Sequence, residues 1–208
     1  MSNPILGIIG GGQLGSLLAE AAKKLNIETV ILSDDINAPA KNFTKNFVCG
    51  SYEDEKIINK FISKVDLVTF EFENIPYKVL KNINEHKTVL PKPKINKLIQ
   101  NRYSEKDFLN KIDIRTTRYV LIKDEEEIIF NQSLIPGILK TCTLGYDGKG
   151  QYKINSTKNI NENIDFNKEY ILEKIINLKK RYRLSLLDLV IKDMKYTNQS
   201  KMFMKIKF

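Results

Sequence analysis

The stretch Ile5-Leu6-Gly7-Ile8-Ile9-Gly10-Gly11-Gly12-Gln13-Leu14-Gly15 joins an apolar run to a helical pattern. Residues 5–9 have the length and character of a buried strand. Apolar residues then recur at helical spacing over residues 14–25. The glycines between them permit a tight turn, and Gly10-x-Gly12-x-x-Gly15 has the spacing of a phosphate-binding helix N-terminus. This stretch therefore predicts the first strand–turn–helix unit of an α/β domain.

The same alternation continues to about residue 100. Strands are expected at 28–32, 66–72 and 88–90, and helices at 53–62 and 77–84. Strands that alternate with helices predict a parallel sheet covered on both faces. Pro91 and Pro93 mark the end of this Rossmann-like domain, which we place at residues 1–100.

A second unit, of α+β type, is expected from residue 101. Ser104 with Asp107 resembles a capping box that opens a helix through Ile112. Strands are expected at 118–122, 135–140, 151–154 and 169–172, with an acidic helix at 124–130.

Composition excludes several classes of protein. The chain has 208 residues, 42% hydrophobic and 28% charged, as a globular protein does. No apolar run approaches the roughly 18 residues of a membrane span, and no signal peptide or membrane association is expected. Cys49 and Cys142 form no C-x-x-C motif, so neither zinc nor a disulfide is expected, which suits the cytoplasm. Of the net charge of +9, +5 falls in residues 181–208. No basic stripe interleaved with aromatic residues is present, so nucleic acid is not the expected partner.

Two further segments carry chemistry. Gly145-Tyr146-Asp147-Gly148-Lys149-Gly150-Gln151 follows Lys140 at the end of an expected strand, which together could clamp a polyphosphate. Phe70-Glu71-Phe72-Glu73-Asn74-Ile75-Pro76 leaves another strand at its carboxyl end, where open α/β sheets bind ligands. Strand alternation would put Glu71 and Glu73 on one face. A glycine hairpin and a solvated acidic face are the alternatives without function.

These three segments, in this order, resemble the N5-carboxyaminoimidazole ribonucleotide synthetase family, which are ATP-grasp enzymes of purine biosynthesis. The resemblance runs from about Ile5 to Lys180. It implies ATP-dependent carboxylation of aminoimidazole ribonucleotide by bicarbonate, through carboxyphosphate, with Mg²⁺. It makes residues 101–180 the start of an ATP-grasp fold and implies a homodimer.

The resemblance also assigns residues. Arg102 and Lys140 would contact the ATP phosphates, and the loop Gly145, Tyr146, Asp147, Gly148, Lys149, Gly150 and Gln151 would close on them. Glu173, Lys174, Ile175 and Ile176 would hold the adenine through their backbone. Gln13, Leu14, Glu73 and Tyr146 would contact the ribonucleotide. No catalytic residue and no metal ligand is assigned within this chain.

Residues 181–208 depart from the family. Arg181-Tyr182-Arg183 stands where an acidic residue for the ATP ribose is expected. Back-translated in a shifted frame, Met194, Met202 and Met204 give Glu, Val and Glu, which fit the family's next strands. We therefore expect that a base was gained or lost near Lys179-Lys180, leaving an aberrant tail, no magnesium ligands and an inactive chain. A genuine divergent tail is the alternative.

Three other functions stay open. One is a different ATP-grasp ligase, and another is a nucleotide-binding fragment without catalysis. The third is a nicotinamide-dependent oxidoreductase, because Asp34 and Asp35 lie about 20 residues after the first glycines, where a dinucleotide enzyme holds a ribose.

Overall fold

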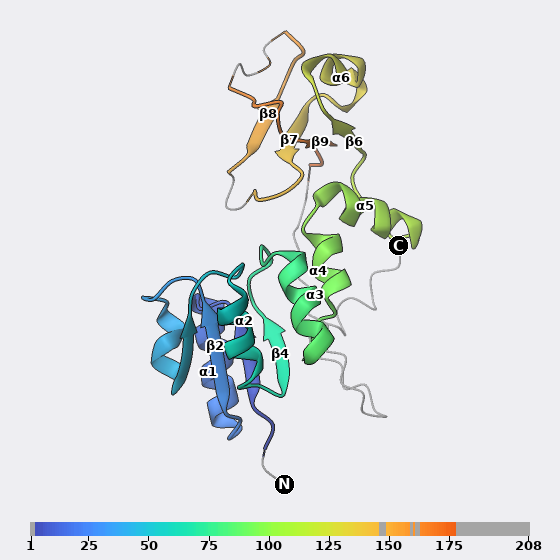
Figure 1. Cartoon of the computed structure of the whole chain (residues 1–208). Coiled ribbons are helices and arrows are strands. Elements are labelled where there is room, and N and C mark those ends of the chain that lie inside the picture. Colours follow the sequence, from blue (N-terminus) through green and yellow to red (C-terminus); the bar gives the residue numbers. More distant parts are fainter. Residues whose placement is uncertain (1–2, 146–148, 159, 161–162, 178–208) are drawn as a thin grey trace. The chain divides into compact units, whose positions relative to one another are not determined.

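The first sheet is fully parallel, as predicted. The computed structural model describes residues 3–145, 149–158, 160 and 163–177 (Figure 1). Strands β1 (Leu6–Ile9), β2 (Thr29–Ser33), β3 (Asn46–Cys49), β4 (Leu67–Phe70) and β5 (Thr88–Val89) lie in the order β3-β2-β1-β4-β5. Each neighbouring pair runs parallel. Strand β3 was not predicted, because its four residues form a half-buried edge strand without a long apolar run.

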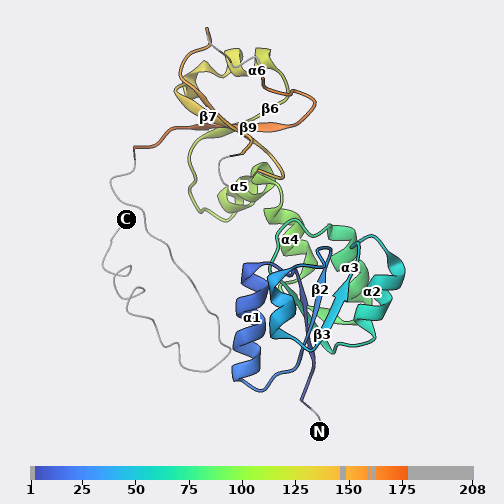
Figure 2. The ribbon, with the colours of Figure 1, turned by 90° about the vertical axis from the view of Figure 1, so that its left-hand side faces the viewer.

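Helices cover both faces of this sheet (Figure 2). On one face, α2 (Glu55–Ile62) and α3 (Tyr77–His86) bury Phe61, Leu80 and Ile83 against the strands. On the other face, α1 (Gln13–Lys24) and the 3-10 helix η1 (Pro39–Phe43) bury Ala19 and Ala40 against Ile8 and Ile31. The small residues on the second face let α1 pack closely on β1.

Glycines make the turn from β1 to α1 possible. Gly10 has a φ of +108°, which side-chain-bearing residues rarely adopt. A Cβ on Gly15 would lie 2.4 Å from the backbone oxygen of Gly10. The helix can therefore approach the strand only with glycine at position 15.

The segment after β5 is helical rather than a boundary. Pro93 is the first residue of α4 (Pro93–Ile99), where its missing N–H costs nothing. The sequence analysis did not predict this helix, which begins at the second of the two prolines.

The second sheet is antiparallel. Strands β6 (Tyr119–Ile122), β7 (Gly137–Thr141), β8 (Gln151–Ile154) and β9 (Tyr170–Lys174) lie in the order β6-β9-β7-β8. One face packs on a core that includes Ile122, Leu139 and Leu172. Helix α6 (Glu125–Phe130) and the 3-10 helix η2 (Gln132–Leu134) contribute Ile128 and Leu134 to it.

Helix α5 (Arg102–Lys111) begins earlier than predicted. Its N-cap is Asn101, whose side chain accepts a hydrogen bond from the Ser104 amide at 3.0 Å. Ser104 lies inside the first turn, so the predicted capping box was wrong. The early start places Arg102 and Lys106 four residues apart on one helix, on neighbouring positions of its surface.

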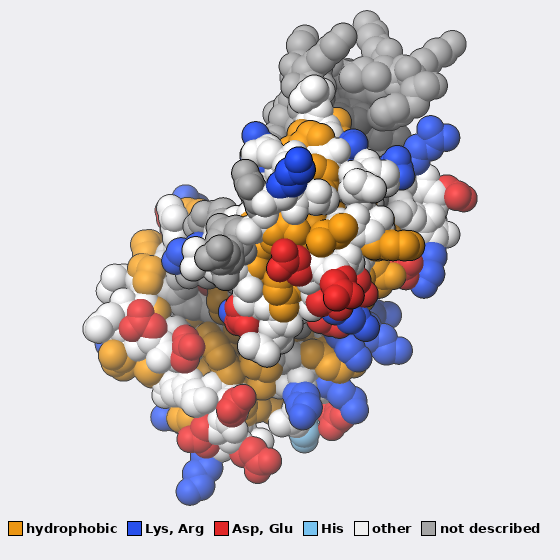
Figure 3. Space-filling model, turned by 90° about the horizontal axis from the view of Figure 1, so that it is seen from above, with side chains coloured by type: hydrophobic (Ala, Val, Ile, Leu, Met, Phe, Trp, Pro, Cys, Tyr) orange, Lys and Arg blue, Asp and Glu red, His pale blue; other side chains and the backbone are white. Residues whose placement is uncertain are grey.

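No helix in the described ranges is long and apolar enough to span a membrane. In the view of Figure 3, Lys and Arg side chains are interspersed with Asp and Glu.

We expect Gly15→Ala to destabilise the fold strongly. The added methyl would meet backbone, which cannot rotate away, and overpacking of this kind costs about 2 to 3 kcal/mol. Gly12→Ala is the matched control, since its Cβ would meet only the tip of the Glu71 side chain, at 3.2 Å. Urea unfolding followed by circular dichroism measures both. Equal midpoints for the two variants would contradict the packing constraint.

Candidate functional site

Two predicted segments meet at the carboxyl edge of the parallel sheet. Strands β1 and β4 are neighbours, with Ile9 opposite Phe70, and the chain leaves them toward opposite sides of the sheet order. Such a switch point is where open α/β sheets bind ligands. Gln13 and Leu14 are the first residues of α1, directly after the glycine turn, and Glu73 lies in the turn after β4; all three are exposed.

The carboxylate of Glu71 lies over the glycine turn. The Gly12 amide donates to Glu71 Oε1 at 3.2 Å, and a Cβ on Gly10 would lie 2.6 Å from the same oxygen. Strand β4 ends at Phe70, so the predicted alternation does not extend to Glu71 and Glu73. The negative charge stands where a dinucleotide enzyme binds phosphate. This geometry counts against the oxidoreductase alternative.

The acidic residues after β2 have other partners. Asp35 Oδ1 accepts from the Asn37 amide at 2.8 Å, which closes a local turn. Burial, together with the nearby Asp34 carboxylate, raises the pKa of Tyr52 to about 12. Tyr52 is therefore a neutral phenol beside Asp34 at physiological pH.

Helix α4 fixes the backbone around Glu73. The Gln100 side-chain amide donates to the carbonyls of Glu73 at 2.6 Å and Ile75 at 2.7 Å. Asn96, fully buried, donates to the Ile75 carbonyl at 3.3 Å. Both residues lie in or just after the helix that was not predicted, so this support could not be foreseen.

Opposite charges lie together on the face of the second sheet that is turned away from its core. Lys140 Nζ lies 2.8 Å from Glu173 Oε2, and Lys106 Nζ lies 3.4 Å from Glu173 Oε1. The side chains of Lys106, Lys140 and Glu173 are only 18%, 22% and 10% exposed. Lys140 and Glu173 were predicted, but for Glu173 only the backbone was assigned. Lys106 was not predicted, although its spacing from Arg102 was a usable signal.

Arg102 holds the entrance of the glycine loop. Its Nη1 donates to the Thr141 carbonyl at 2.9 Å, and its Nη2 donates to the Gly145 carbonyl. Cβ atoms on Gly145 and Gly150 would lie 2.8 and 2.7 Å from Thr141 Oγ1, so both loop ends pass close to this side chain. Lys149 is exposed at the far end of the loop, and Gln151 pairs with Lys140 in the sheet. Tyr146, Asp147 and Gly148 lie outside the described residues.

Part of the backbone after Glu173 is already hydrogen-bonded within the protein. The Lys174 amide donates to the Arg118 carbonyl at 2.9 Å, and the Ile175 amide donates to the Pro136 carbonyl at 3.2 Å. The Lys174 carbonyl accepts from Thr117 Oγ1 at 2.8 Å. Ile176 is 56% exposed.

Within the described ranges, neither a reactive thiol nor a metal site accompanies these groups. Burial raises the pKa of Cys142 to about 11, so the thiol stays protonated at neutral pH. Among the described residues, no three His, Cys, Asp or Glu side chains converge to hold a metal. Glu173, the carboxylate beside Lys140, is already paired with ammonium groups, so the residues described do not fit Mg²⁺.

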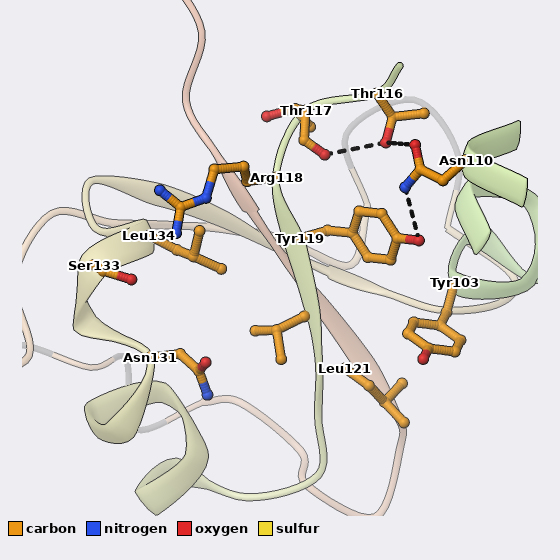
Figure 4. Close-up of a pocket in the computed structure, with 11 residues that line it drawn as sticks. Tyr103, Asn110, Thr116, Thr117, Arg118, Tyr119, Leu121, Asn131, Ser133 and Leu134 are labelled. Atoms are coloured by element: carbon orange, nitrogen blue, oxygen red, sulfur yellow. Dashed lines mark hydrogen bonds between the residues drawn. The ribbon is translucent and has the colours of Figure 1, made fainter. Parts of the chain in front are cut away.

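A separate hollow lies away from these residues. It has a volume of about 610 Å³ along edge strand β6 and is lined by Tyr103, Tyr119, Leu121 and Leu134 among others (Figure 4). Asn110 bridges its wall by donating to the Tyr119 hydroxyl at 3.1 Å. None of the predicted site residues lines it, and we do not assign it a ligand.

Two domain families match this chain. Residues 4–100 match the ribonucleotide synthetase preATP-grasp domain, and residues 107–194 match the ATP-grasp domain. The second match includes part of the segment 181–208, which lies outside the described residues and to which an aberrant tail was assigned.

Several of the matched proteins are N5-carboxyaminoimidazole ribonucleotide synthases. An N5-carboxyaminoimidazole ribonucleotide synthase from Brucella melitensis is 40% identical over 153 residues, which are 73% of this chain and 42% of the relative. The solved N5-carboxyaminoimidazole synthetase from Staphylococcus aureus, complexed with ADP, matches 85% of this chain with a TM-score of 0.80 and 33% identity, covering 48% of the relative. The enzyme from Aspergillus clavatus, in complex with ADP and 5-aminoimidazole ribonucleotide, matches with a TM-score of 0.76 and 26% identity, over 85% of this chain and 48% of that one.

The chain spans about half the length of the relatives it matches. Within that half, the order of the two sheets, the glycine turn after β1 and the lysine of β7 before the second glycine loop agree with the family resemblance. The chain is a homologue of the N5-carboxyaminoimidazole ribonucleotide synthases.

Proposed function

We propose that this chain carries the ribonucleotide-binding domain and the first part of the ATP-binding domain of an ATP-dependent carboxylase. Its reaction would join bicarbonate to the amine of 5-aminoimidazole ribonucleotide, with ATP as the source of energy. The observation that carries the proposal is that Arg102 and Lys140 both lie at the ends of the loop 145–151. Arg102 donates to the Thr141 and Gly145 carbonyls, and Lys140 pairs with Gln151 in the sheet. The domain boundary would lie near residue 100.

In this proposal the second unit binds ATP. Phosphoryl transfer asks mainly for cations and backbone donors around the phosphates and for exclusion of water. Lys140 and Arg102 supply cations, and Gly145 to Gln151 supply a backbone that can come close to an anion. The segment Glu173 to Ile176 would lie along the adenine. Because the Lys174 amide and carbonyl and the Ile175 amide are already bonded within the protein, the exposed Ile176 would supply the main backbone contact.

The first unit would bind the ribonucleotide. Gln13, Leu14 and Glu73 lie on turns that follow adjacent strands, and Tyr146 would approach from the glycine loop. The complex of the Aspergillus clavatus enzyme with 5-aminoimidazole ribonucleotide supports this ligand. Glu73 could accept a hydrogen bond from the amine or from a hydroxyl of the ligand.

We further propose Mg²⁺ as a cofactor, a homodimer and a cytoplasmic location. Mg²⁺ would accompany ATP through carboxylates that the described part of this chain does not provide. A homodimer is proposed for the full-length enzyme. The free cysteines Cys49 and Cys142 suit the cytoplasm, where this reaction would take place.

Ligand titration tests the proposal. We expect the purified 208-residue chain to bind ADP and 5-aminoimidazole ribonucleotide in isothermal titration calorimetry, and not NADH in a fluorescence titration. Phosphate release in the presence of ATP, bicarbonate and the ribonucleotide then separates a catalyst from a nucleotide-binding fragment. Binding of NADH in place of ADP would refute the proposal.

Lys140→Met should weaken ADP binding at least about tenfold, since a charge-assisted hydrogen bond to phosphate contributes about 1.5 to 3 kcal/mol. Binding of 5-aminoimidazole ribonucleotide should change less than twofold. Lys168→Met is the matched control, because Lys168 also pairs with a carboxylate, Asp165 at 3.2 Å, but is exposed and lies away from the predicted site. Equal loss of both ligands would argue against a phosphate role for Lys140.

Glu73→Gln should show the opposite selectivity. Removal of its charge should raise the dissociation constant of the ribonucleotide about tenfold and leave that of ADP unchanged, because one charged hydrogen bond is lost. Glu85→Gln, an exposed carboxylate on α3, is the control. An unchanged ribonucleotide affinity would remove Glu73 from the site.

A further inference from the structure

Two ammonium groups share one carboxylate on the face of the second sheet that is turned away from its core. Lys106 comes from α5 and Lys140 from β7, and both reach Glu173 on β9, at 3.4 and 2.8 Å. The three side chains are at most 22% exposed. The cluster therefore holds two positive charges and one negative charge where water has little access.

The surplus positive charge needs a partner. Unbalanced charge is costly to hold at a partly buried position, because low local dielectric strengthens repulsion and removes hydration. In the part of the chain that the structure describes, Glu173 is the one carboxylate within ion-pair distance of either lysine. Lys106 gains a weaker contact from the ring of Tyr119, whose centroid is 5.8 Å from Nζ. An anionic ligand would neutralise the cluster.

Helix α5 directs two of its three cations toward β7 and β9, while the third, Lys111, pairs with Asp107 on the same helix. Arg102 and Lys106 are four residues apart, which puts them on one face of the helix. Arg102 reaches the carbonyls of Thr141 and Gly145, and Lys106 reaches Glu173. Lys140 precedes Thr141 on β7 and shares Glu173 with Lys106, so Arg102 and Lys106 both contact the immediate partners of Lys140.

We propose that Lys106 is a phosphate ligand of the nucleotide site, acting beside Lys140, with Glu173 holding both ammonium groups ready. The assignment rests on the proposed ATP site and adds a residue to it. When a phosphate takes one ammonium group, the other keeps the Glu173 carboxylate paired. The buried carboxylate is then never left without a cation.

Inorganic tripolyphosphate tests this inference separately from adenine recognition. Isothermal titration calorimetry of the 208-residue chain should show that Lys106→Met weakens the binding of tripolyphosphate and of ADP at least tenfold. Lys106→Gln can still donate a hydrogen bond to Glu173 but has no charge. Its affinity for both ligands should fall as much as that of Lys106→Met. Lys106→Arg should stay within threefold of the unchanged protein. Lys97→Met is the matched control, because Lys97 lies 5.0 Å from the ring centroid of Tyr77 and has no role in the site.

Each other outcome has a defined meaning. If Lys106→Met binds tripolyphosphate and ADP with full affinity, the inference is overturned. It is also overturned if Lys106→Gln alone keeps full affinity, since Lys106 would then only position Glu173. Absence of tripolyphosphate binding by the unchanged chain also overturns it. Tripolyphosphate binding that depends on Lys106, without any binding of ADP, would support the anion site and refute the proposed nucleotide function. Thermal melts of each variant confirm that the protein compared is folded.

Discussion

The strand order β3-β2-β1-β4-β5 is the constraint on which the first domain depends. Because β1 and β4 are neighbours while the chain leaves them in opposite directions, their carboxyl ends face an opening that no connection crosses. The glycine turn fills one side of this opening, and the segment that begins with Glu71 fills the other. The close packing of α1, which requires Gly15, keeps the first turn of that helix at the edge of the sheet.

Alternation along two strands has the same importance in the second domain. Leu139 and Leu172 point into the apolar core, so Lys140 and Glu173, one residue further along, must point to the opposite face. A register shift of one residue would bury the lysine in the core and remove leucine from it. The hydrophobic core therefore fixes the geometry of the charged cluster, although no core side chain touches a ligand.

The sequence predicted the elements whose periodicity is strong, such as β1, α1 and β7, and the parallel and α+β character of the two units. Periodicity failed at β3, an edge strand of four residues, and at α4, where prolines suggested an end. The cap of α5 was misassigned because Ser104 and Asn101 are both good capping residues, and only the backbone conformation distinguishes them. The support of Glu73 by Gln100 and the pairing of Glu173 with Lys106 join residues 27 and 67 positions apart, which no local pattern encodes.

The two glycine-rich motifs of this chain meet opposite electrostatic surroundings, and that difference decides which of them suits a polyphosphate. At Gly10 to Gly15 the protein supplies its own anion, since Glu71 accepts from the Gly12 amide, so a phosphate there would meet a negative charge. At the described ends of the loop 145–151, Arg102 donates to the Gly145 carbonyl, and Lys140 pairs with Gln151 in the sheet. Glycine spacing alone makes backbone amides accessible in both places. The charges that the fold brings beside them separate a turn that holds an internal carboxylate from a loop suited to nucleotide phosphates.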